Sequence, residues 1–114
     1  MVTIPYKKYY PESDIILING QEWTFRLNSS KCEKYSELAI REYSKEPVYA
    51  EWRKPSVGRY FESNSAACWV EVEVFGIDTF YFIFKIDQNG QVIDKKMFSE
   101  RAPHIQDYPL RPFE

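Results

Sequence analysis

The stretch WVEVEVF, residues 69–75, alternates valine with tryptophan, glutamate or phenylalanine, and FYFIFKI, residues 80–86, follows it after a short gap. Alternation with a period of two is typical of a β-strand, because successive side chains of a strand point to opposite faces of the sheet. A hairpin that pairs Val74 with Phe80 places the valines of the first strand beside the phenylalanines of the second. The pattern therefore predicts two antiparallel strands that share one apolar face.

A third strand is expected across the Asn-Gly pair at residues 89–90, since this pair accepts the backbone angles of a tight hairpin turn. A two-residue turn there would put Ile86 beside Ile93 and Phe84 opposite Lys95. The lysine fits the core face only if its stem lies along the phenylalanine ring and its ammonium group reaches water.

The sequence of the N-terminal half predicts a further hairpin and one helix. Residues 15–18 and 21–27 flank another Asn-Gly pair, and the second run alternates apolar and polar side chains. Ser29 or Ser30 can cap a helix over residues 31–45, in which apolar residues recur at helical spacing. Pro47 is expected to end that helix, because the residue before a proline disfavours helical geometry.

Residues 48–62 have the least distinct pattern. Val48, Ala50 and Trp52 alternate like a strand, and KPSVG, residues 54–58, supplies turn residues before a strand at residues 59–62. A short helix that starts at Pro47 fits as well. Residues 63–67, SNSAA, are predicted to form a loop.

Together these elements predict an α+β fold: an N-terminal hairpin, one main helix and a C-terminal antiparallel meander packed on the helix. The 114 residues are expected to form a single domain, residues 1–114, with a core that needs neither disulfides nor metals. Residues 1–13 are predicted to be an arm, and residues 98–114 an irregular, proline-rich tail packed on the body.

Composition excludes several classes of function. The net charge of −2 and pI near 5.5 give no general attraction to polyanions. No apolar run is long enough for a signal peptide or a membrane span, so we expect a cytoplasmic protein. Cys32 and Cys68 are interpreted as free, buried thiols. His104, the only histidine, has no companions at metal-ligand spacing, so neither a metal nor another cofactor is expected.

The second face of the predicted strands suggests a binding surface. It combines carboxylates with large apolar groups and is too apolar to face only solvent, so we expect the tail, a partner protein or a second copy of the chain to cover it. The residues predicted to bind a partner there are Trp69, Glu71, Glu73, Tyr81 and Ile83. Glu71 and Glu73 would lie about 7 Å apart on one face, a separation that paired carboxylates in glycoside hydrolases also show. Glutamates on the open side of a strand have a simpler role in solubility, which we favour. No catalytic residue is assigned, and an enzyme is the less favoured class.

The leading hypothesis is a non-catalytic protein-binding module that acts through this acidic and aromatic face, because tyrosine and tryptophan give large contact area and carboxylates steer a basic partner. Small inhibitors such as bacterial immunity proteins are comparable in size and charge. Self-association through the same face would be lost on Ile83→Lys.

Two alternatives remain open at this point. The first is a small-ligand or enzymatic pocket between helix and sheet, lined by Tyr35, Tyr43, Tyr60 and Phe82. The second is nucleic-acid binding, because the YKKYY segment combines cations with rings on which bases can stack. The residues assigned to that role are Tyr6, Lys7, Lys8, Tyr9, Arg53 and Lys54. The absence of a basic surplus disfavours this alternative.

Overall fold

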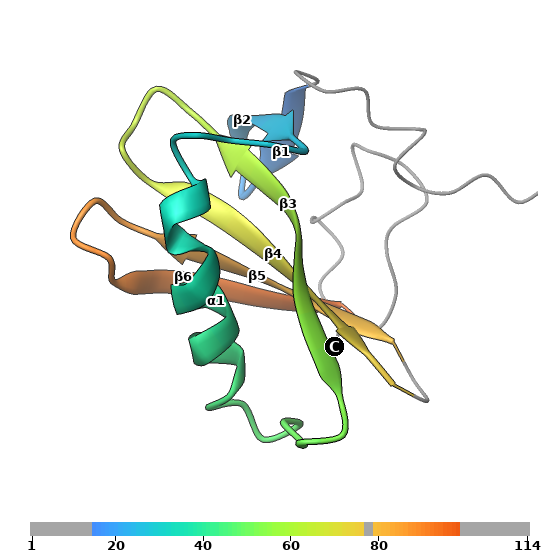
Figure 1. Cartoon of the computed structure of the whole chain (residues 1–114). Helices are drawn as coiled ribbons and strands as arrows, with labels where there is room; N and C mark the ends of the chain where they lie inside the picture. The colour runs from blue at the N-terminus through green and yellow to red at the C-terminus, as the bar shows by residue number, and fades with distance from the viewer. Residues whose placement is uncertain (1–14, 77–78, 99–114) are drawn as a thin grey trace, which may run out of the picture.

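The computed structural model describes residues 15–76 and 79–98, which form a curled antiparallel sheet with one short helix on one face (Figure 1). The six strands follow one another in the sheet in the order of the sequence. They are β1 (Ile15–Ile18), β2 (Gln21–Arg26), β3 (Lys54–Glu62), β4 (Cys68–Phe75), β5 (Phe80–Ile86) and β6 (Val92–Phe98). Between β2 and β3 the chain forms a 3-10 helix, η2 (Glu33–Tyr35), and the helix α1 (Ser36–Tyr43). The predicted α+β class is confirmed.

The central hairpin has the register predicted from the alternating valines. Val74 pairs with Phe80, and Val70 pairs with Phe84. These side chains are buried beneath α1, because each strand presents every second residue to that face. Residues 77–78 of the predicted turn lie outside the described residues.

The turn between β5 and β6 is longer than the Asn-Gly pair predicts. The Asp87 carboxylate accepts hydrogen bonds from the backbone N–H groups of Asn89 and Gln91, at 2.9 and 3.0 Å, and Gly90 has a φ of 76°. The additional turn residue shifts the register, so Ile86 pairs with Val92. The predicted pairing with Ile93 is therefore wrong for a physical reason: the Asp87 side chain stabilises a wider turn than a two-residue one.

Beyond that turn the predicted register holds, and Phe84 does oppose Lys95. The Lys95 ammonium group reaches outward and lies 2.8 Å from the Glu46 carboxylate on the segment after α1. The lysine stem thus covers apolar surface while its charge remains at the exterior, as this position requires.

The N-terminal hairpin forms around the predicted tight turn. Asn19 and Gly20 have φ angles of 54° and 80°, which a turn with two left-handed residues needs. Both strands alternate buried and exposed side chains, and Trp23 and Phe25 are buried as expected. Leu27 lies beyond the end of β2 and is exposed.

The helix is shorter than the apolar periodicity predicts. The Ser29 hydroxyl accepts a hydrogen bond from the Cys32 N–H at 3.0 Å, so one of the two candidate serines does cap this segment. Residues 30–32 then form a turn and η2 follows, so regular α-helix begins only at Ser36 and ends at Tyr43, before Pro47.

Two predictions for residues 48–58 are wrong. Residues 48–53 form turns rather than a strand, and KPSVG belongs to β3. Pro55 fits this strand because β2 pairs only with residues 60–62 of β3 in the described part of the chain. The first half of β3 therefore has a neighbour on one side only, where a missing N–H is tolerated. The loop predicted at residues 63–67 is confirmed, since no strand or helix is found there.

Apolar side chains pack on both faces of the sheet. The first core lies between α1 and strands β3 to β6. The second lies on the opposite face, where the β1–β2 hairpin packs against β3, β4 and β5. Its buried members are Ile16, Ile18, Trp23, Phe25, Phe61, Trp69 and Ile83. The sheet curls far enough for the Asn19 amide to donate a hydrogen bond to the Asp94 carboxylate on β6, at 3.2 Å.

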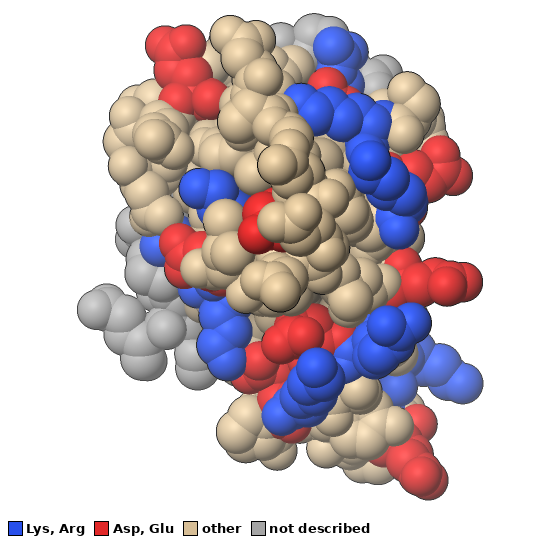
Figure 2. All heavy atoms as spheres, turned by 90° about the vertical axis from the view of Figure 1, so that its left-hand side faces the viewer, with Lys and Arg blue, Asp and Glu red and all other residues tan. Residues whose placement is uncertain are grey.

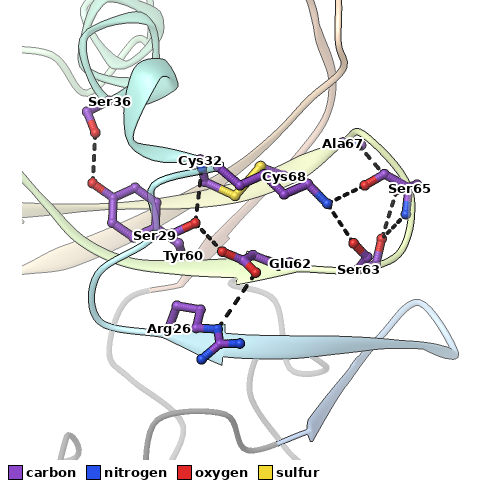
Figure 3. Close-up of a disulfide and its surroundings, with 11 residues drawn as sticks. Arg26, Ser29, Cys32, Ser36, Tyr60, Glu62, Ser63, Ser65, Ala67 and Cys68 are labelled. Atoms are coloured by element: carbon purple, nitrogen blue, oxygen red, sulfur yellow. Dashed lines mark hydrogen bonds and ion pairs between the residues drawn. A yellow bond between two sulfur atoms is a disulfide. The ribbon is translucent and has the colours of Figure 1, made fainter.

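Cys32 and Cys68 form a disulfide that joins the start of the helical segment to the start of β4 (Figure 3). Their Cα atoms are 5.8 Å apart and both residues are fully buried. The interpretation of these cysteines as free thiols is therefore wrong. Sequence spacing alone could not reveal the bond, because a sequence separation of 36 conceals the proximity of the two cysteines in the fold.

Polar contacts around the disulfide attach the same segment to the β3–β4 connection (Figure 3). The Ser29 hydroxyl donates to the Glu62 carboxylate, and the Lys31 ammonium donates to the backbone carbonyl of Ser63 at 2.6 Å. The Ser36 and Tyr60 hydroxyls lie 2.8 Å apart. Covalent and polar links thus fix the N-terminal end of the helical segment on the sheet.

Candidate functional site

A bulge in β3 places an arginine beside a glutamate on the second face of the sheet. The register shifts between Val57 and Tyr60, so Gly58 and Arg59 together oppose Glu71 of β4. An extra residue in one strand redirects the side chain next to it. The bulge therefore places Arg59 on the face that carries Glu71.

Arg59 and Glu71 form a buried, two-point ion pair. The Arg59 Nε and Nη2 atoms donate to the Glu71 Oε1 and Oε2 atoms, at 3.0 and 2.6 Å. Both side chains are 0% exposed. This parallel geometry is the strong form of arginine–carboxylate pairing. The Glu71 charge is thus compensated inside the protein and is not presented to a partner.

Gly58 allows the carboxylates of two neighbouring glutamates to lie against the β3 backbone. A Cβ atom at this position would overlap the side chains of both Glu71 and Glu73. Glu73 itself is half-buried, at the margin of the same face. The acidic pair noted in the sequence is therefore part of the packing between β3 and β4.

The structure buries most of the predicted partner-binding residues. Trp69, Glu71 and Ile83 are at most 1% exposed, whereas Glu73 and Tyr81 are half-buried. Direct contact of the three buried side chains with a partner would require the chain to open. Partner binding through this face stays a prediction, and only its two half-buried members are accessible to contact.

The N-terminal hairpin supplies part of the cover that this face requires. The Trp23 ring meets the Trp69 ring edge to face, with centroids 6.3 Å apart, and the Lys85 ammonium lies 5.4 Å from the Trp23 ring centroid. The sequence suggested the C-terminal tail as cover, but residues 99–114 lie outside the described residues. Ile93 on β6 is exposed.

The four residues expected to line a pocket between helix and sheet are packed in the first core, although Phe82 also borders a hollow beside β6. Tyr35, Tyr43, Tyr60 and Phe82 all belong to the first core and are at most 8% exposed. Burial raises the pKa of the Tyr43 hydroxyl above its usual value of 10.0, and the Ala50 backbone and the Arg53 guanidinium oppose this only in part. The pocket alternative receives no support from this part of the structure.

Exposed aromatic residues lie on the connection between α1 and β3. Tyr49 is 44% exposed and Trp52 is 55% exposed, although both are large apolar groups. The Arg53 guanidinium lies 4.4 Å from the Trp52 ring centroid and 4.7 Å from the Phe80 ring centroid. We call Tyr49, Trp52 and Arg53 the aromatic surface.

Edge-to-face and tilted ring contacts connect this surface to the core. Tyr49 packs on Tyr43, and Tyr43 packs on Phe82, with centroid distances of 5.5 and 5.7 Å. Phe80, beneath Arg53, also packs on Phe82, at 6.0 Å. Tyr49 is therefore supported by a buried ring, and Trp52 contacts the Arg53 guanidinium, which in turn lies over Phe80. Such support reduces the conformational entropy that these side chains lose on binding.

A hollow of about 340 Å³ opens beside the aromatic surface, between the segment after α1 and β6. Its walls are apolar and consist of Pro47, Val48, Phe82 and Met97. Glu46, Lys95 and Lys96 also line it, and the Lys95 ammonium is paired with the Glu46 carboxylate at 2.8 Å. Lys96 opposes Ile83 on β5, so its side chain starts on the opposite face of the sheet. We call this feature the β6 hollow.

A wider groove of about 730 Å³ lies on the other side of the molecule, between the β1–β2 hairpin and the loop at residues 63–67. Polar residues such as Gln21, Glu22 and Asn64 form much of its lining, and the exposed Ile93 also contributes. The Trp23 ring, which packs edge to face on Trp69, also borders this groove.

The residues assigned to nucleic-acid binding are not brought together as one basic patch in the described part of the chain. Tyr6, Lys7, Lys8 and Tyr9 lie outside the described residues, Arg53 is stacked between rings, and Lys54 is exposed at the start of β3. Lysine and arginine side chains are interspersed with acidic ones on the face shown in Figure 2. Residues 15–76 and 79–98 also contain no cluster of three potential metal ligands. His104 lies beyond them.

Comparison with known proteins does not assign a family. No family model, curated protein or solved structure matches this chain. Among the described residues, no helix combines the length and the apolar character needed to cross a bilayer. Only the geometry of the chain itself therefore bears on its function.

Proposed function

We propose that this protein is a non-catalytic protein-binding module whose binding surface is the aromatic surface at the C-terminal end of α1. The observation that carries the proposal is the exposure of Tyr49, which packs on the buried Tyr43 ring, and of Trp52, which contacts the Arg53 guanidinium. Tryptophan, tyrosine and arginine are the residues that most often dominate the energy of protein interfaces. This surface replaces the second sheet face in the hypothesis, because Trp69 and Glu71 are buried.

The narrower expectation of a small inhibitor or immunity-type protein is one form of this proposal and stays a prediction. Self-association also stays a prediction. Ile83→Lys no longer tests it cleanly, because Ile83 is buried and a charge there would destabilise the monomer itself. Nucleic-acid binding through the N-terminal segment remains the less favoured alternative.

We also propose that the protein works in an oxidising compartment rather than in the cytoplasm expected from the sequence. The Cys32–Cys68 disulfide supports this, because such bonds persist mainly where thiols are not kept reduced. Native extract quenched with a thiol-reactive polyethylene glycol tests the assignment by gel shift. We expect no gel shift after denaturation alone and a shift only after denaturation and reduction. A shift after denaturation without reductant would show that the cysteines are free thiols, and would refute the oxidising compartment.

The binding proposal is tested with tagged wild-type protein, Trp52→Ser and the control Ile93→Ser. Both residues are about half exposed, at 55% and 53%, but they lie on different parts of the molecule. A captured protein is identified by mass spectrometry, and its affinity for each purified variant is measured by calorimetry. We expect Trp52→Ser to weaken binding at least about thirtyfold, the loss typical of a central interface residue, while Ile93→Ser binds like wild type. Equal binding by all three proteins would refute the proposed surface.

A further inference from the structure

The stretch Asn28-Ser29-Ser30 matches the acceptor sequence for N-linked glycosylation, in which a serine or threonine stands two positions after an asparagine and the residue between them is not proline. It is the only such match in the sequence. The remaining asparagines, Asn19, Asn64 and Asn89, have no hydroxyl at that position. The match has a meaning only in a chain that enters the compartment where this modification takes place.

The fold turns both ends of this motif to solvent. Asn28 lies in a bend directly after β2, and Asn28 and Ser30 are exposed, whereas Ser29 between them is 4% exposed. Ser29 is held inward because its hydroxyl donates a hydrogen bond to the Glu62 carboxylate and accepts one from the Cys32 N–H. Asn28 belongs to neither apolar core, so a bulky group attached to it displaces no core side chain.

The disulfide supplies the second observation, because it points to the compartment that the motif requires. Cys32 follows the motif closely, and its bond to Cys68 is fully buried. The lumen of the endoplasmic reticulum is one of the oxidising environments in which such bonds form. A disulfide and an exposed acceptor sequence on the same segment are therefore consistent with one route through the cell.

We propose that Asn28 carries an N-linked glycan. The proposal rests on the oxidising compartment proposed above and narrows it to one that supplies an oligosaccharide on a lipid pyrophosphate. In the transfer, the Asn28 Nδ2 atom forms a bond to the anomeric carbon of the oligosaccharide and loses a proton. The bond from that carbon to the pyrophosphate oxygen breaks, and the lipid pyrophosphate leaves with the electron pair.

The attachment point and the aromatic surface lie at opposite ends of the helical segment. Figure 1 shows that the connection from β2 enters this segment at one end and that the connection to β3 leaves it at the other. Residues 33–43 of η2 and α1 lie between them, which corresponds to roughly 15–20 Å of helix. A glycan on Asn28 therefore leaves Trp52 accessible to a partner and shields Leu27, which is exposed beside it.

The test uses the full-length protein isolated from its native cells. The protein is denatured and treated, in heavy-oxygen water, with the amidase that removes N-linked glycans, and the masses of the intact protein and of its peptides are measured. We expect the intact mass to fall by that of one oligosaccharide. Asn28 should be recovered as an aspartate that carries the heavy isotope, because the amidase hydrolyses the bond at its side-chain nitrogen. Asn64, which is exposed but has no hydroxyl two positions later, should remain unlabelled.

Variants produced in the same cells separate recognition of the motif from other effects. Ser30→Ala should abolish the glycan although Asn28 is still present, and Ser30→Thr should retain it, because only the second variant keeps the hydroxyl. Asn28→Gln should abolish it as well. Asn64→Gln is the matched control, since it makes the same change at an exposed asparagine outside the motif and should leave the glycan in place.

An intact mass that the amidase does not change would overturn the proposal, and so would a glycan that persists in Ser30→Ala. The thiol gel shift described above shows which proposal has failed. Unglycosylated protein with an intact disulfide refutes the glycan and leaves the oxidising compartment standing. Unglycosylated protein with free thiols refutes both.

Discussion

Removal of the Cys32–Cys68 disulfide should lower the free energy of unfolding by about 4 kcal/mol. The bond joins positions 36 residues apart, and the chain-entropy relation gives this value for a loop of that size, because the cross-link restricts the unfolded chain. A domain of this size is stabilised by roughly 5–15 kcal/mol in total, so the reduced protein should still fold, with a small margin.

The assay is urea unfolding followed by tryptophan fluorescence and circular dichroism. With a denaturant dependence of roughly 2 kcal/mol per molar urea, the midpoint should fall by about 2 M in Cys32→Ala/Cys68→Ala. Wild-type protein unfolded in the presence of reductant is the matched control, because it loses the bond and keeps both buried side chains. Equal midpoints for oxidised and reduced wild type would refute the assigned role of the disulfide.

Three further predictions concern the buried polar groups. Arg59→Met and Glu71→Leu should each lower the free energy of unfolding by about 3–5 kcal/mol, because each leaves an uncompensated buried charge. The double variant should recover most of this lost stability, and additive losses in urea unfolding would contradict the coupling. Gly58→Ala should lower stability by roughly 1–3 kcal/mol in the same assay, since its Cβ would displace a glutamate held by Arg59; a gain in stability would count against the close contact. The Tyr43 pKa is higher in the folded than in the unfolded state. The contribution of this difference to the free energy of unfolding is therefore complete below pH 10 and declines as the pH rises further. Unfolding midpoints of wild type and Tyr43→Phe should therefore diverge only above about pH 10, and parallel profiles throughout would exclude this role.

The alternation of side chains along the sequence was sufficient to predict the central part of the fold. Alternation at residues 69–75 predicted both the bounds of β4 and its register with β5, because one buried face tolerates no shift by a single residue. Asn19-Gly20 predicted the first turn for an equally local reason. At Asn89-Gly90 the same pair was misleading, since the Asp87 side chain caps a wider turn.

Contacts between distant residues could not be predicted in this way. Pro55 indicated a turn because the sequence does not show that, among the described residues, the first half of β3 pairs with β4 alone. The arginine that compensates Glu71 lies in another strand and reaches it only through a bulge. Trp52 was assigned to a strand, so its exposure beside Arg53 was missed, although WR followed by KP in the sequence is compatible with a surface turn.

The hydrogen bond between Asn19 and Asp94 has a consequence for the order of folding events. Strands that neighbour one another in sequence can pair early, because their loops are short and close at little entropic cost. The contact between the first hairpin and β6 spans 75 residues and requires the sheet to have curled already. We therefore expect Asp94→Ala, which removes the acceptor and leaves the Asn19-Gly20 turn unchanged, to accelerate unfolding with little effect on the refolding rate, which stopped-flow fluorescence would measure directly.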